Sequence, residues 1–357
     1  MKVKIGDLTK IKTGKLDANV SSEDGKYPFF TCSKEPLKIS TYSYDCECVL
    51  VAGNGDLNVK YYNGKFDAYQ RTYIIEANGS GKLYMPYLYY FMEDYIDELR
   101  KQAIGGVIKY IKLANLTDAL IELPSVDEQK SIVEILKKVK GILDKRNDEI
   151  RELDNLIKAR FVELFECGDH EIVKASDVCD FITKGTTPPT GEITEEYENG
   201  KIPFLKVYNL SFTGEMLFDE NPQYILAETH NGKLARSKVY PNDVLMNIVG
   251  PPLGKFTLVT DEFEEWNINQ AIAIFRAKER ILPRFLLHAL MQPKVLEPFI
   301  GQAVGIRQQN LSLEQCRNLQ FPLPSLEEQK SFVEFAEQLD KSKVAVQKAL
   351  DETQILF

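Results

Sequence analysis

The sequence Leu-Pro-Ser-Val-Asp-Glu-Gln-Lys-Ser at residues 123–131 returns as Leu-Pro-Ser-Leu-Glu-Glu-Gln-Lys-Ser at residues 323–331. The two copies lie 200 residues apart, and each begins a long stretch with helical periodicity. A period this long is too large for a solenoid repeat, so it indicates one domain-plus-helix unit that occurs twice. The molecule is therefore expected to have approximate two-fold symmetry and to present two similar surfaces to a ligand with two similar halves.

Each copy of this motif has the features of a helix N-terminus. Pro124-Ser125 and Pro324-Ser325 precede acidic residues, which are favourable near the positive end of a helix dipole. Beyond the first copy, mostly apolar residues step by four and three over more than four heptads, which is typical of a coiled coil. These positions are Ile132, Leu136, Val139, Leu143, Arg146, Ile150, Leu153, Ile157, Arg160 and Leu164. The second helix repeats the register at Phe332, Ala336, Leu339, Lys343, Val346, Leu350, Thr353 and Phe357.

The second helical stretch is the shorter one, and its register includes the polar residues Lys343 and Thr353. Alone it would form a poor coiled coil, and pairing with the first helix would remedy this. We expect an antiparallel intramolecular coiled coil that holds two globular domains at opposite ends. The alternative is a pair of amphipathic helices, each packed on its own domain.

The globular parts that precede the two motifs also correspond. The residues of Val3–Leu8 find a counterpart in 173–178, and Tyr27–Phe30 in 202–205, with short β-rich runs and Gly or Asn turns after them. The fold class is predicted to be α+β, with two similar mixed domains separated by two long helices and related by a pseudo-two-fold axis. The predicted boundaries are 1–122 for the first domain, 123–166 for the first helix, 167–322 for the second domain and 323–357 for the second helix.

Composition limits the possible functions. The chain has no run of about eighteen apolar residues and no signal peptide at its start, so a cytoplasmic protein without a membrane span is expected. Six scattered cysteines indicate reduced thiols, and three isolated histidines make a metal site improbable. The net charge of −9 argues against a freestanding, nonspecific nucleic-acid binder. That charge lies almost entirely after residue 166, where 19 Lys/Arg face 27 Asp/Glu.

Three segments resemble catalytic or cofactor motifs but do not match them. The segment 250–255 is one residue short of a phosphate-binding loop and contains two prolines, so it is interpreted as a turn before a strand. The segment 52–56 lacks the third glycine and the helix of a dinucleotide-binding loop. Asn221-Pro222-Gln223-Tyr224 differs at its third position from the adenine-methyltransferase motif Asn-Pro-Pro-Tyr. The chain is therefore predicted to be noncatalytic.

Several loops combine cationic, amide and hydroxyl side chains, which suit phosphates and base edges in the major groove of DNA. The candidates in the first domain are Lys12, Lys15, Lys34, Asn54, Asn58, Lys60 and Arg71. Those in the second are Lys184, Thr186, Thr187, Lys206, Asn209, Lys255, Arg307, Gln308 and Gln309. The cluster at 307–309 follows a Gly-bearing loop and ranks highest. The pairs Tyr69-Gln70 and Asn269-Gln270 lie inside predicted strands and are interpreted as structural.

The sequence resembles a specificity subunit of a Type I restriction-modification system. The features that carry this resemblance are the two Leu-Pro-Ser-x-x-Glu-Gln-Lys segments, Lys184-Gly-Thr-Thr-Pro188 and Ile202-Pro-Phe-Leu205. The resemblance covers essentially the whole chain. It implies two target recognition domains, each binding one half of a split DNA sequence. It also implies that the helices set the spacer and dock two methyltransferase subunits, to which restriction subunits are added. S-adenosylmethionine, ATP and Mg would be used by those partners, and no cofactor would be bound by this chain.

The first domain departs from the family pattern, because it has Lys12-Thr13-Gly14-Lys15 where the second has the Gly-x-Thr-Pro element. This difference is expected if the domains read different half-sites, and the target should then be asymmetric. A second hypothesis is a coiled-coil scaffold that binds only proteins. It explains the repeat but leaves the amide-rich, cationic loops unexplained. A methyltransferase is a third hypothesis, which the missing cofactor and catalytic motifs disfavour.

Overall fold

A computed structural model describes residues 1–189, 191–198, 200–250, 252–300 and 310–355 of the 357-residue chain. Its contacts divide the chain into two compact units: Met1–Asp144, joined by residues 353–355, and Lys145–Glu352. Each unit contains a mixed α+β domain, as predicted from the sequence. None of the described helices is long and apolar enough to cross a membrane.

The first unit is built on a six-stranded sheet with the order β2-β7-β5-β6-β3-β4. A separate antiparallel pair, β1 and β8, joins the two ends of the domain. The elements are β1 (Lys2–Lys4), β2 (Thr9–Thr13), β3 (Tyr27–Phe30), β4 (Leu37–Ile39), β5 (Tyr44–Ala52), β6 (Val59–Ala68), β7 (Thr72–Ala77), α1 (Met85–Gln102), α2 (Leu113–Thr117) and β8 (Leu120–Glu122). Short 3-10 turns occupy Ile5–Asp7 and Ala18–Val20.

Burial on both faces explains why β5 is the centre of this sheet. Its last five residues, Cys48 to Ala52, are all buried, as expected for a strand covered on both sides. Val49 and Val51 belong to the core that includes Leu88 and Met92 of α1. Leu50 belongs to a second core beneath the opposite face. The helix α1 therefore covers one face of the sheet and leaves the strand ends free to carry loops.

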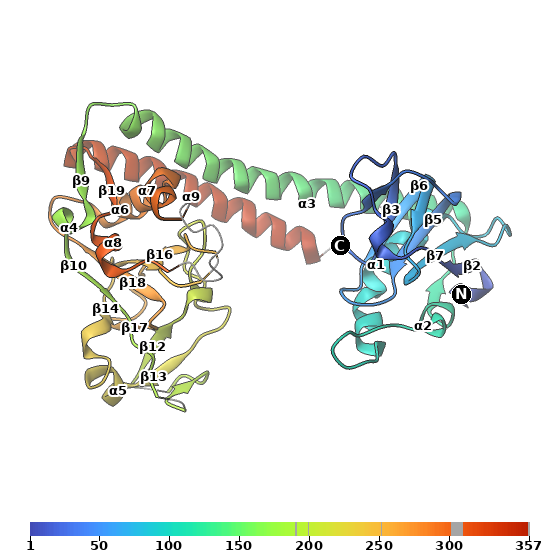
Figure 1. Ribbon diagram of the computed structural model, residues 1–357, viewed down its shortest axis with the longest axis horizontal. Helices are drawn as coiled ribbons and strands as arrows, with labels where there is room; N and C mark the ends of the chain where they lie inside the picture. Colours follow the sequence, from blue (N-terminus) through green and yellow to red (C-terminus); the bar gives the residue numbers. More distant parts are fainter. Residues whose placement is uncertain (190, 199, 251, 301–309, 356–357) are drawn as a thin grey trace. The chain divides into compact units, whose positions relative to one another are not determined.

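The second unit has the corresponding elements arranged in two sheets, with the orders β10-β18-β15-β16 and β11-β13-β12-β17-β14. Its strands are β9 (Glu171–Lys174), β10 (Cys179–Lys184), β11 (Ile193–Thr194), β12 (Lys201–Leu205), β13 (Tyr224–Leu226), β14 (Lys238–Val239), β15 (Val244–Asn247), β16 (Phe256–Leu258), β17 (Trp266–Ile268), β18 (Ile272–Ala277) and β19 (Gln320–Leu323). Its helices before the last are α4 (Ala175–Val178), α5 (Ala227–Asn231), α6 (Pro283–Leu290), α7 (Pro293–Ile300) and α8 (Leu313–Arg317). Figure 1 shows β12, β13 and α5 at the end of this unit away from the long helices.

Two differences separate the units. The strand β6 is continuous in the first unit, pairing antiparallel with β5 and then parallel with β3. In the second unit its counterpart is divided into β16 and β17 by a loop. The single helix α1 of the first unit also corresponds to two helices, α6 and α7, in the second unit. Pro293 begins the second of them, where its missing N–H and fixed φ prevent an unbroken helix.

The repeated motif fastens the long helix α3 (Val126–Phe161) to the first domain. Ser125 and Glu128 form a capping box, in which Glu128 Oε2 accepts from the Ser125 amide at 2.8 Å. Gln129 is completely buried. Its Nε2 donates to the carbonyl oxygens of Lys82 and Pro124, both at 2.9 Å, and its Oε1 accepts from the Tyr84 amide at 2.8 Å. The glutamine therefore ties the helix start to the segment that precedes α1.

The second copy makes the same contacts at the start of α9 (Leu326–Ile355). Glu328 Oε2 accepts from the Ser325 amide at 2.9 Å. Gln329 is completely buried, and its Nε2 donates to the carbonyls of Arg280 at 3.1 Å and Pro324 at 2.9 Å. Its Oε1 accepts from the Leu282 amide at 2.8 Å. This glutamine latch, formed by Gln129 in one unit and Gln329 in the other, is the structural reason for the repeat.

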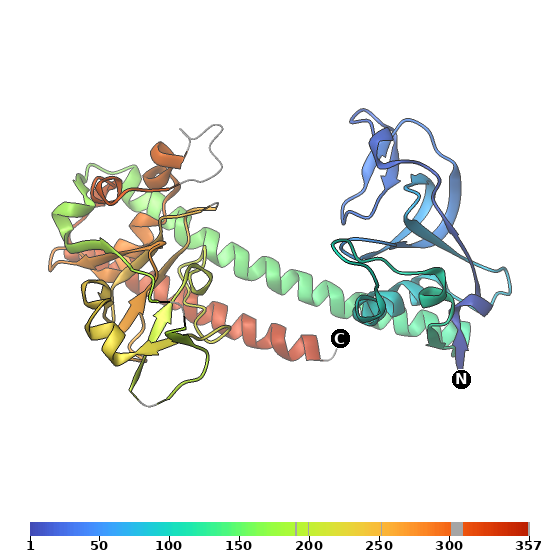
Figure 2. The ribbon, with the colours of Figure 1, turned by 60° about the horizontal axis from the view of Figure 1, so that its bottom comes forward.

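Within the second unit, α9 runs antiparallel to the last part of α3 (Figures 1 and 2). Phe332 near the start of α9 packs edge-on against Phe161 at the end of α3, with ring centroids 5.4 Å apart. Further along α9, Lys343 Nζ lies 2.7 Å from Asp154 Oδ1 and 2.7 Å from Asp340 Oδ1. Burial opposes the charge of Lys343, but these carboxylates outweigh it and raise its pKa. Lys343, a polar residue of the predicted seam, thus forms buried ion pairs, and its pairing with Asp154 fixes the register of the two helices.

The structure places the predicted seam residues as follows. Ile157 and Leu350 are buried, and the half-buried residues are Ile132, Leu136, Val139, Leu143, Ile150, Leu153, Leu339 and Val346. In the first unit the face of α3 that meets α1 also includes Val133, which is buried, and Lys140, whose Nζ lies 3.3 Å from Glu93 Oε1.

Candidate nucleic-acid interface

A glycine at the end of the first long strand anchors the candidate loops in both units. Gly14 follows β2, and a Cβ at this position would lie 2.1 Å from the Ala68 carbonyl oxygen. Gly185 follows β10, and a Cβ there would lie 2.2 Å from the Ile268 carbonyl oxygen and 2.1 Å from that of Asn269. Neither space admits any side chain. Gly14 in Lys12-Thr13-Gly14-Lys15 is therefore the structural counterpart of Gly185 in Lys184-Gly-Thr-Thr-Pro188, although the sequences around them differ.

The residues opposite these glycines are also equivalent. Asp67 and Asn267 are buried at the same point of the sheet, and each accepts a hydrogen bond from the next backbone amide at 2.9 Å. This contact shapes the turn into which Gly14 or Gly185 packs. Tyr69-Gln70 and Asn269-Gln270 lie in these turns, between β6 and β7 and between β17 and β18. The prediction that both pairs lie inside strands is wrong, because the hydrogen-bonded acidic or amide side chain ends the strand first.

Hydrogen bonds bring four loops of the first unit together, two of them between backbone groups and one from a side chain. The Gly14 amide donates to the Thr72 carbonyl at 3.0 Å, and the Gly53 amide donates to the Arg71 carbonyl at 2.8 Å. Asn58 Nδ2 donates to the Cys32 carbonyl at 2.8 Å. The loops after β2, β3, β5 and β6 thus converge on one edge of the sheet. We call these residues the first loop cluster: 14–16, 31–34, 53–58 and 69–72.

The candidate side chains of this cluster fall into two groups. Lys15, Lys34 and Arg71 are exposed and directed at solvent. Asn54, Asn58 and Lys60 are half-buried and hold the loops: Asn54 Oδ1 accepts from Cys32 Sγ at 2.9 Å, and Lys60 donates to Asn58 Oδ1. Burial lowers the pKa of Lys60. A phosphate that approached this ammonium group would favour its charged form.

Lys12 has a different environment from Lys15. Its ammonium group pairs with Glu76 on the neighbouring strand β7 and lies 4.8 Å from the centroid of the Tyr44 ring. Burial opposes the charge of Lys12, but the pairing with Glu76 outweighs it and raises the pKa. Lys12 is thus already engaged by protein groups and would have to exchange them for a ligand.

Sequence reasoning did not identify a hairpin at 104–110 as part of this site. The Ile104 amide donates to the Tyr110 carbonyl at 3.0 Å, and the Tyr110 amide donates back at 2.8 Å. The Gly55 amide donates to the Lys109 carbonyl at 3.0 Å, which joins the hairpin to the first loop cluster. The glycines at 105 and 106 are typical of a loop, and no pattern in the sequence indicates that this loop contacts Gly55.

In the second unit the equivalent loops follow β10, β12, β15 and β17. Lys184 and Thr187 are exposed. Thr186 Oγ1 accepts from Arg236 Nε at 3.2 Å and from Arg236 Nη2 at 3.1 Å. Arg236 is itself exposed, and sequence reasoning missed it because fifty residues separate it from Thr186. It extends the basic surface beside Lys184.

The structure contradicts one candidate in this unit. Asn209 is completely buried: its Oδ1 accepts from the Lys206 amide at 2.9 Å and its Nδ2 donates to the Leu217 carbonyl at 3.1 Å. It caps the turn at Val207–Asn209 and does not face a ligand, so its prediction as a DNA contact is wrong. Lys206 and Lys255 are half-buried, and Lys255 Nζ lies 5.7 Å from the centroid of the Phe212 ring.

The highest-ranked candidates, Arg307, Gln308 and Gln309, lie outside the described residues. The backbone immediately after them is described. Asn310 forms an antiparallel bridge with Val249, as Tyr110 does with Asn54 in the first unit. Asn310 therefore occupies the position in the second unit that Tyr110 occupies in the first.

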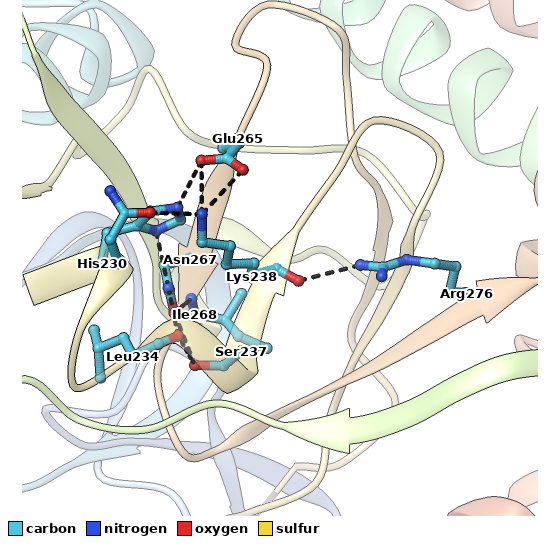
Figure 3. A network of polar contacts seen from close by, with 9 residues as sticks. His230, Leu234, Ser237, Lys238, Glu265, Asn267, Ile268 and Arg276 are labelled. Carbon is cyan, nitrogen blue, oxygen red and sulfur yellow. Dashed lines mark hydrogen bonds and ion pairs between the residues drawn. The ribbon is translucent and has the colours of Figure 1, made fainter. Parts of the chain in front are cut away.

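A buried polar network supports the loops that follow β10, β12, β15 and β17, which we call the second loop cluster (Figure 3). Asn267 Nδ2 contacts His230 Nδ1 at 3.0 Å, and Asn267 Oδ1 accepts from Ser237 Oγ at 3.0 Å. Beyond the histidine, Glu265 Oε2 lies 2.9 Å from His230 Nε2 and 3.1 Å from Lys238 Nζ. Burial lowers the pKa of His230, although Glu265 opposes the shift. These side chains converge from α5, from β14 and β17, and from the residue just before each of these two strands, and they position the turn that meets Gly185.

In the described parts of the chain, no group of three or more His, Cys, Asp or Glu side chains could hold a metal ion. The six cysteines are free thiols, and burial raises the pKa of Cys179 and Cys316 to about 12. The site is thus a pair of exposed loop clusters, each with cationic and amide groups on a rigid sheet edge. Such a surface suits phosphates and base edges.

Comparison with known proteins supports this interpretation. A family model described as the Type I restriction modification DNA specificity domain matches residues 1–153 and 168–353. The EcoDI Type I restriction enzyme specificity subunit of Escherichia coli is 37% identical over 156 residues, which are 44% of this chain and 34% of that protein. The MjaVIII specificity subunit of Methanocaldococcus jannaschii is 25% identical over 386 residues, covering 97% of this chain and 89% of the relative.

A crystal structure of the S subunit of a Type I restriction-modification system from M. genitalium has the same fold. It aligns with a TM-score of 0.56 and 17% identity, covering 100% of this chain and 93% of that one. The two family-model matches each contain one loop cluster and one glutamine latch, and together they account for nearly all of the sequence. This chain belongs to the family of Type I restriction-modification DNA specificity subunits.

Proposed function

We propose that this chain is the DNA-recognition subunit of a Type I restriction-modification complex, in which each loop cluster reads one half of a bipartite target. The observation that supports this most directly is the duplicated site itself. Gly14 and Gly185 pack into equivalent turns, while the exposed side chains around them differ. A shared backbone with divergent side chains suits two readers of different base sequences.

The chain acts in this proposal by binding and positioning rather than by catalysis. Adenine methylation and ATP-dependent cleavage would reside in partner subunits, which would use S-adenosylmethionine, ATP and Mg. The complex would work in the cytoplasm, where bacterial or archaeal DNA is accessible to it.

The partners would be two methyltransferase subunits, docked on the long helices, and restriction subunits added to them. Exposed apolar side chains on the helices support such docking. Ile135 and Ile142 in the first unit are one heptad apart on α3, with 60% and 45% of their surfaces exposed. In the second unit, Val344 on α9 is 70% exposed. Apolar residues at heptad spacing on a solvated helix face suit a partner helix.

The two long helices would also set the spacer between the half-sites, at about one turn of DNA between half-site centres. Insertion of one heptad in both helices is expected to lengthen the unread spacer by a few base pairs and to leave both half-sites unchanged. An altered half-site would contradict this role.

The direct test is the adenine methylome of a host that expresses this chain with its neighbouring methyltransferase, compared with the methyltransferase alone. A new split motif that appears only with both proteins would support the proposal and identify both half-sites. If the two proteins copurify and no new motif appears, the coiled-coil scaffold becomes the better explanation.

Side-chain variants then assign the half-sites. Arg71→Ala with Lys15→Ala should weaken binding to the motif and lower its dependence on salt, because each lost phosphate contact reduces the release of counterions. Lys145→Ala with Lys158→Ala, both exposed on α3, is the matched charge control. The control is expected to leave the salt dependence of DNA binding unchanged.

A further inference from the structure

The 104–110 hairpin presents apolar side chains to solvent at its tip. Val107 is fully exposed, 62% of the surface of Ile108 is exposed, and Ile104 and Tyr110 are exposed as well. Four large apolar residues on one short hairpin form a concentrated patch, whereas exposed apolar residues elsewhere are normally scattered singly. Such a patch marks a contact surface.

The backbone holds this tip in place. Two hydrogen bonds join Ile104 and Tyr110 across the hairpin, and the Ile111 amide donates to the Gly53 carbonyl at 3.0 Å. Tyr73 Oη donates to the Ile111 carbonyl at 3.2 Å. Gly105 has a φ of +121°, and a Cβ there would lie 2.5 Å from the Ile108 carbonyl oxygen, so only glycine permits this turn. The side chains of Val107 and Ile108 are therefore presented by a braced loop.

The surroundings of the tip are basic. The segment 102–117 contains Lys109 and Lys112, both exposed, and no acidic residue. Its hydrogen bond to Gly55 makes it continuous with the first loop cluster, which carries Lys15, Lys34 and Arg71. Such a surface has apolar side chains at its tip and cationic side chains around it. It would fit a polyanion in which an apolar group lies at the bottom of a groove between two rows of phosphates.

Double-stranded DNA has one such group. The C5-methyl of thymine lies on the floor of the major groove, which is wide enough for a two-stranded β-ribbon, and none of the other three bases carries a methyl group there. Val107 and Ile108 cannot hydrogen-bond to a base edge. We propose that the 104–110 hairpin enters the major groove and that Val107 and Ile108 contact a thymine methyl group in the half-site of the first domain. This inference rests on the proposed function and adds a chemical element of its specificity.

The test uses the complex of this chain with its methyltransferase and the motif obtained from the methylome. Each thymine of the motif, on both strands, is replaced in turn by deoxyuridine, which removes the methyl group and retains every hydrogen-bonding group. Binding is expected to weaken about three- to tenfold at one or two positions within a single half-site, the amount typical of burying one methyl group.

The variant Val107→Ser with Ile108→Ser removes every methyl group from the side chains of the tip and leaves only small hydroxyl groups there. It should bind thymine and deoxyuridine duplexes equally, while its affinity for DNA outside the motif stays unchanged. Leu120→Ser, at an exposed apolar residue on β8, is the matched control and should keep the full preference for thymine. Circular dichroism and thermal unfolding check that each variant is folded.

Several results would overturn the inference. Deoxyuridine could be tolerated at every position, or the serine variant could keep the same preference for thymine as the wild type. Loss of methyltransferase binding in the variant, with unchanged discrimination against deoxyuridine, would assign the tip to a protein partner instead. A complex that recognises no split motif would overturn the proposed function, and this inference with it, whereas a motif with neutral deoxyuridine substitutions would overturn the inference alone.

Discussion

The two domains bury different chemistry beneath equivalent turns. In the first, Asp67 accepts from Ser43 Oγ at 2.7 Å and from the Ala68 amide. In the second, Asn267 occupies the same position and is the centre of a network with His230, Ser237 and their ionic neighbours. The first domain contains no histidine, because all three lie beyond residue 166.

The difference shows which features the fold requires. Both units keep a glycine where two backbones meet and a buried glutamine where the long helix begins. Both keep an oxygen acceptor for the amide at the turn. The side chains around that acceptor differ between the two units. The buried polar residues can therefore vary, whereas the glycines and the glutamines that hold the backbone together are kept. The comparison can be tested by changing equivalent residues in each unit.

The largest effect is expected from the close-approach glycines. Gly14→Ala and Gly185→Ala should each destabilise their own domain by more than about 3 kcal/mol, because the new Cβ would overlap backbone oxygens that cannot rotate away. Urea unfolding followed by Trp266, the single tryptophan, reports on the second domain, and hydrogen exchange of peptides from 1–122 reports on the first.

Gly106→Ala provides the control for these two substitutions, since a Cβ there meets no atom within 4 Å. A change within about 0.5 kcal/mol is expected. Equal tolerance of alanine at all three positions would show that the turns are not fixed by close packing.

Lowering the pH should reduce the free energy of unfolding of the second domain only, because that domain buries a histidine. Burial, with Arg284 nearby, lowers the pKa of His288 to about 4, whereas an unfolded histidine titrates near 6.5. The unfolded chain therefore binds this proton first, so the second domain is fully stable above pH 6.5 and loses about 3 kcal/mol as the pH falls toward 4. Burial of His230 shifts its pKa in the same direction.

The measurement is the urea midpoint of Trp266 fluorescence between pH 7.5 and 5. His288→Phe, which replaces a ring already packed 5.4 Å from Phe332, should flatten this dependence. Hydrogen exchange of the first domain, corrected for intrinsic rates, should be unchanged over the same range. A wild-type pH profile identical to that of the phenylalanine variant would contradict the assignment.

The glutamine latches should behave alike despite their different surroundings. Gln129→Ala and Gln329→Ala each leave one half-buried amide and two carbonyls without their partner, at a cost of about 2 kcal/mol. Lys130→Ala and Lys330→Ala, the exposed neighbours, are the controls. Unfolding in urea measures all four, and losses that differ by more than about 1 kcal/mol between the glutamines would argue against equivalent roles.

Exchanging the two buried acceptors should have unequal effects, and Asp67→Asn should have the smallest effect of all these variants, apart from the controls. Asn267→Asp turns a donor toward Leu234 into an acceptor, so two oxygens would face each other at a contact now 3.2 Å long, and about 2 kcal/mol should be lost. Asp67→Asn keeps an oxygen for the Ala68 amide and should cost less than about 1 kcal/mol. Thermal unfolding of both variants tests this asymmetry, and equal losses would count against it.

The sequence predicted the architecture better than the site. Periodicity and the repeated motif indicated the α+β domains and the long helices, because these patterns are local and long. Gly14 escaped notice since its φ is ordinary, and only the approach of residues 68 and 69 makes a side chain impossible. Asn209 was chosen for its amide, yet the amide caps its own turn. Arg236 and the 104–110 hairpin join the site through contacts between distant segments, which no local pattern contains.

The glutamine latch has an evolutionary consequence. All three of its partners are backbone groups: the carbonyls of residues 82 and 124 with the amide of 84, and those of 280 and 324 with the amide of 282. Such a joint is indifferent to the side chains of the domain that it holds. A recognition domain could be replaced by a homologous domain with different side chains, joined at any point of the repeated nonapeptide. The glutamine would still hold the start of the long helix. New specificities can therefore arise by exchange of whole domains without repair of the junction.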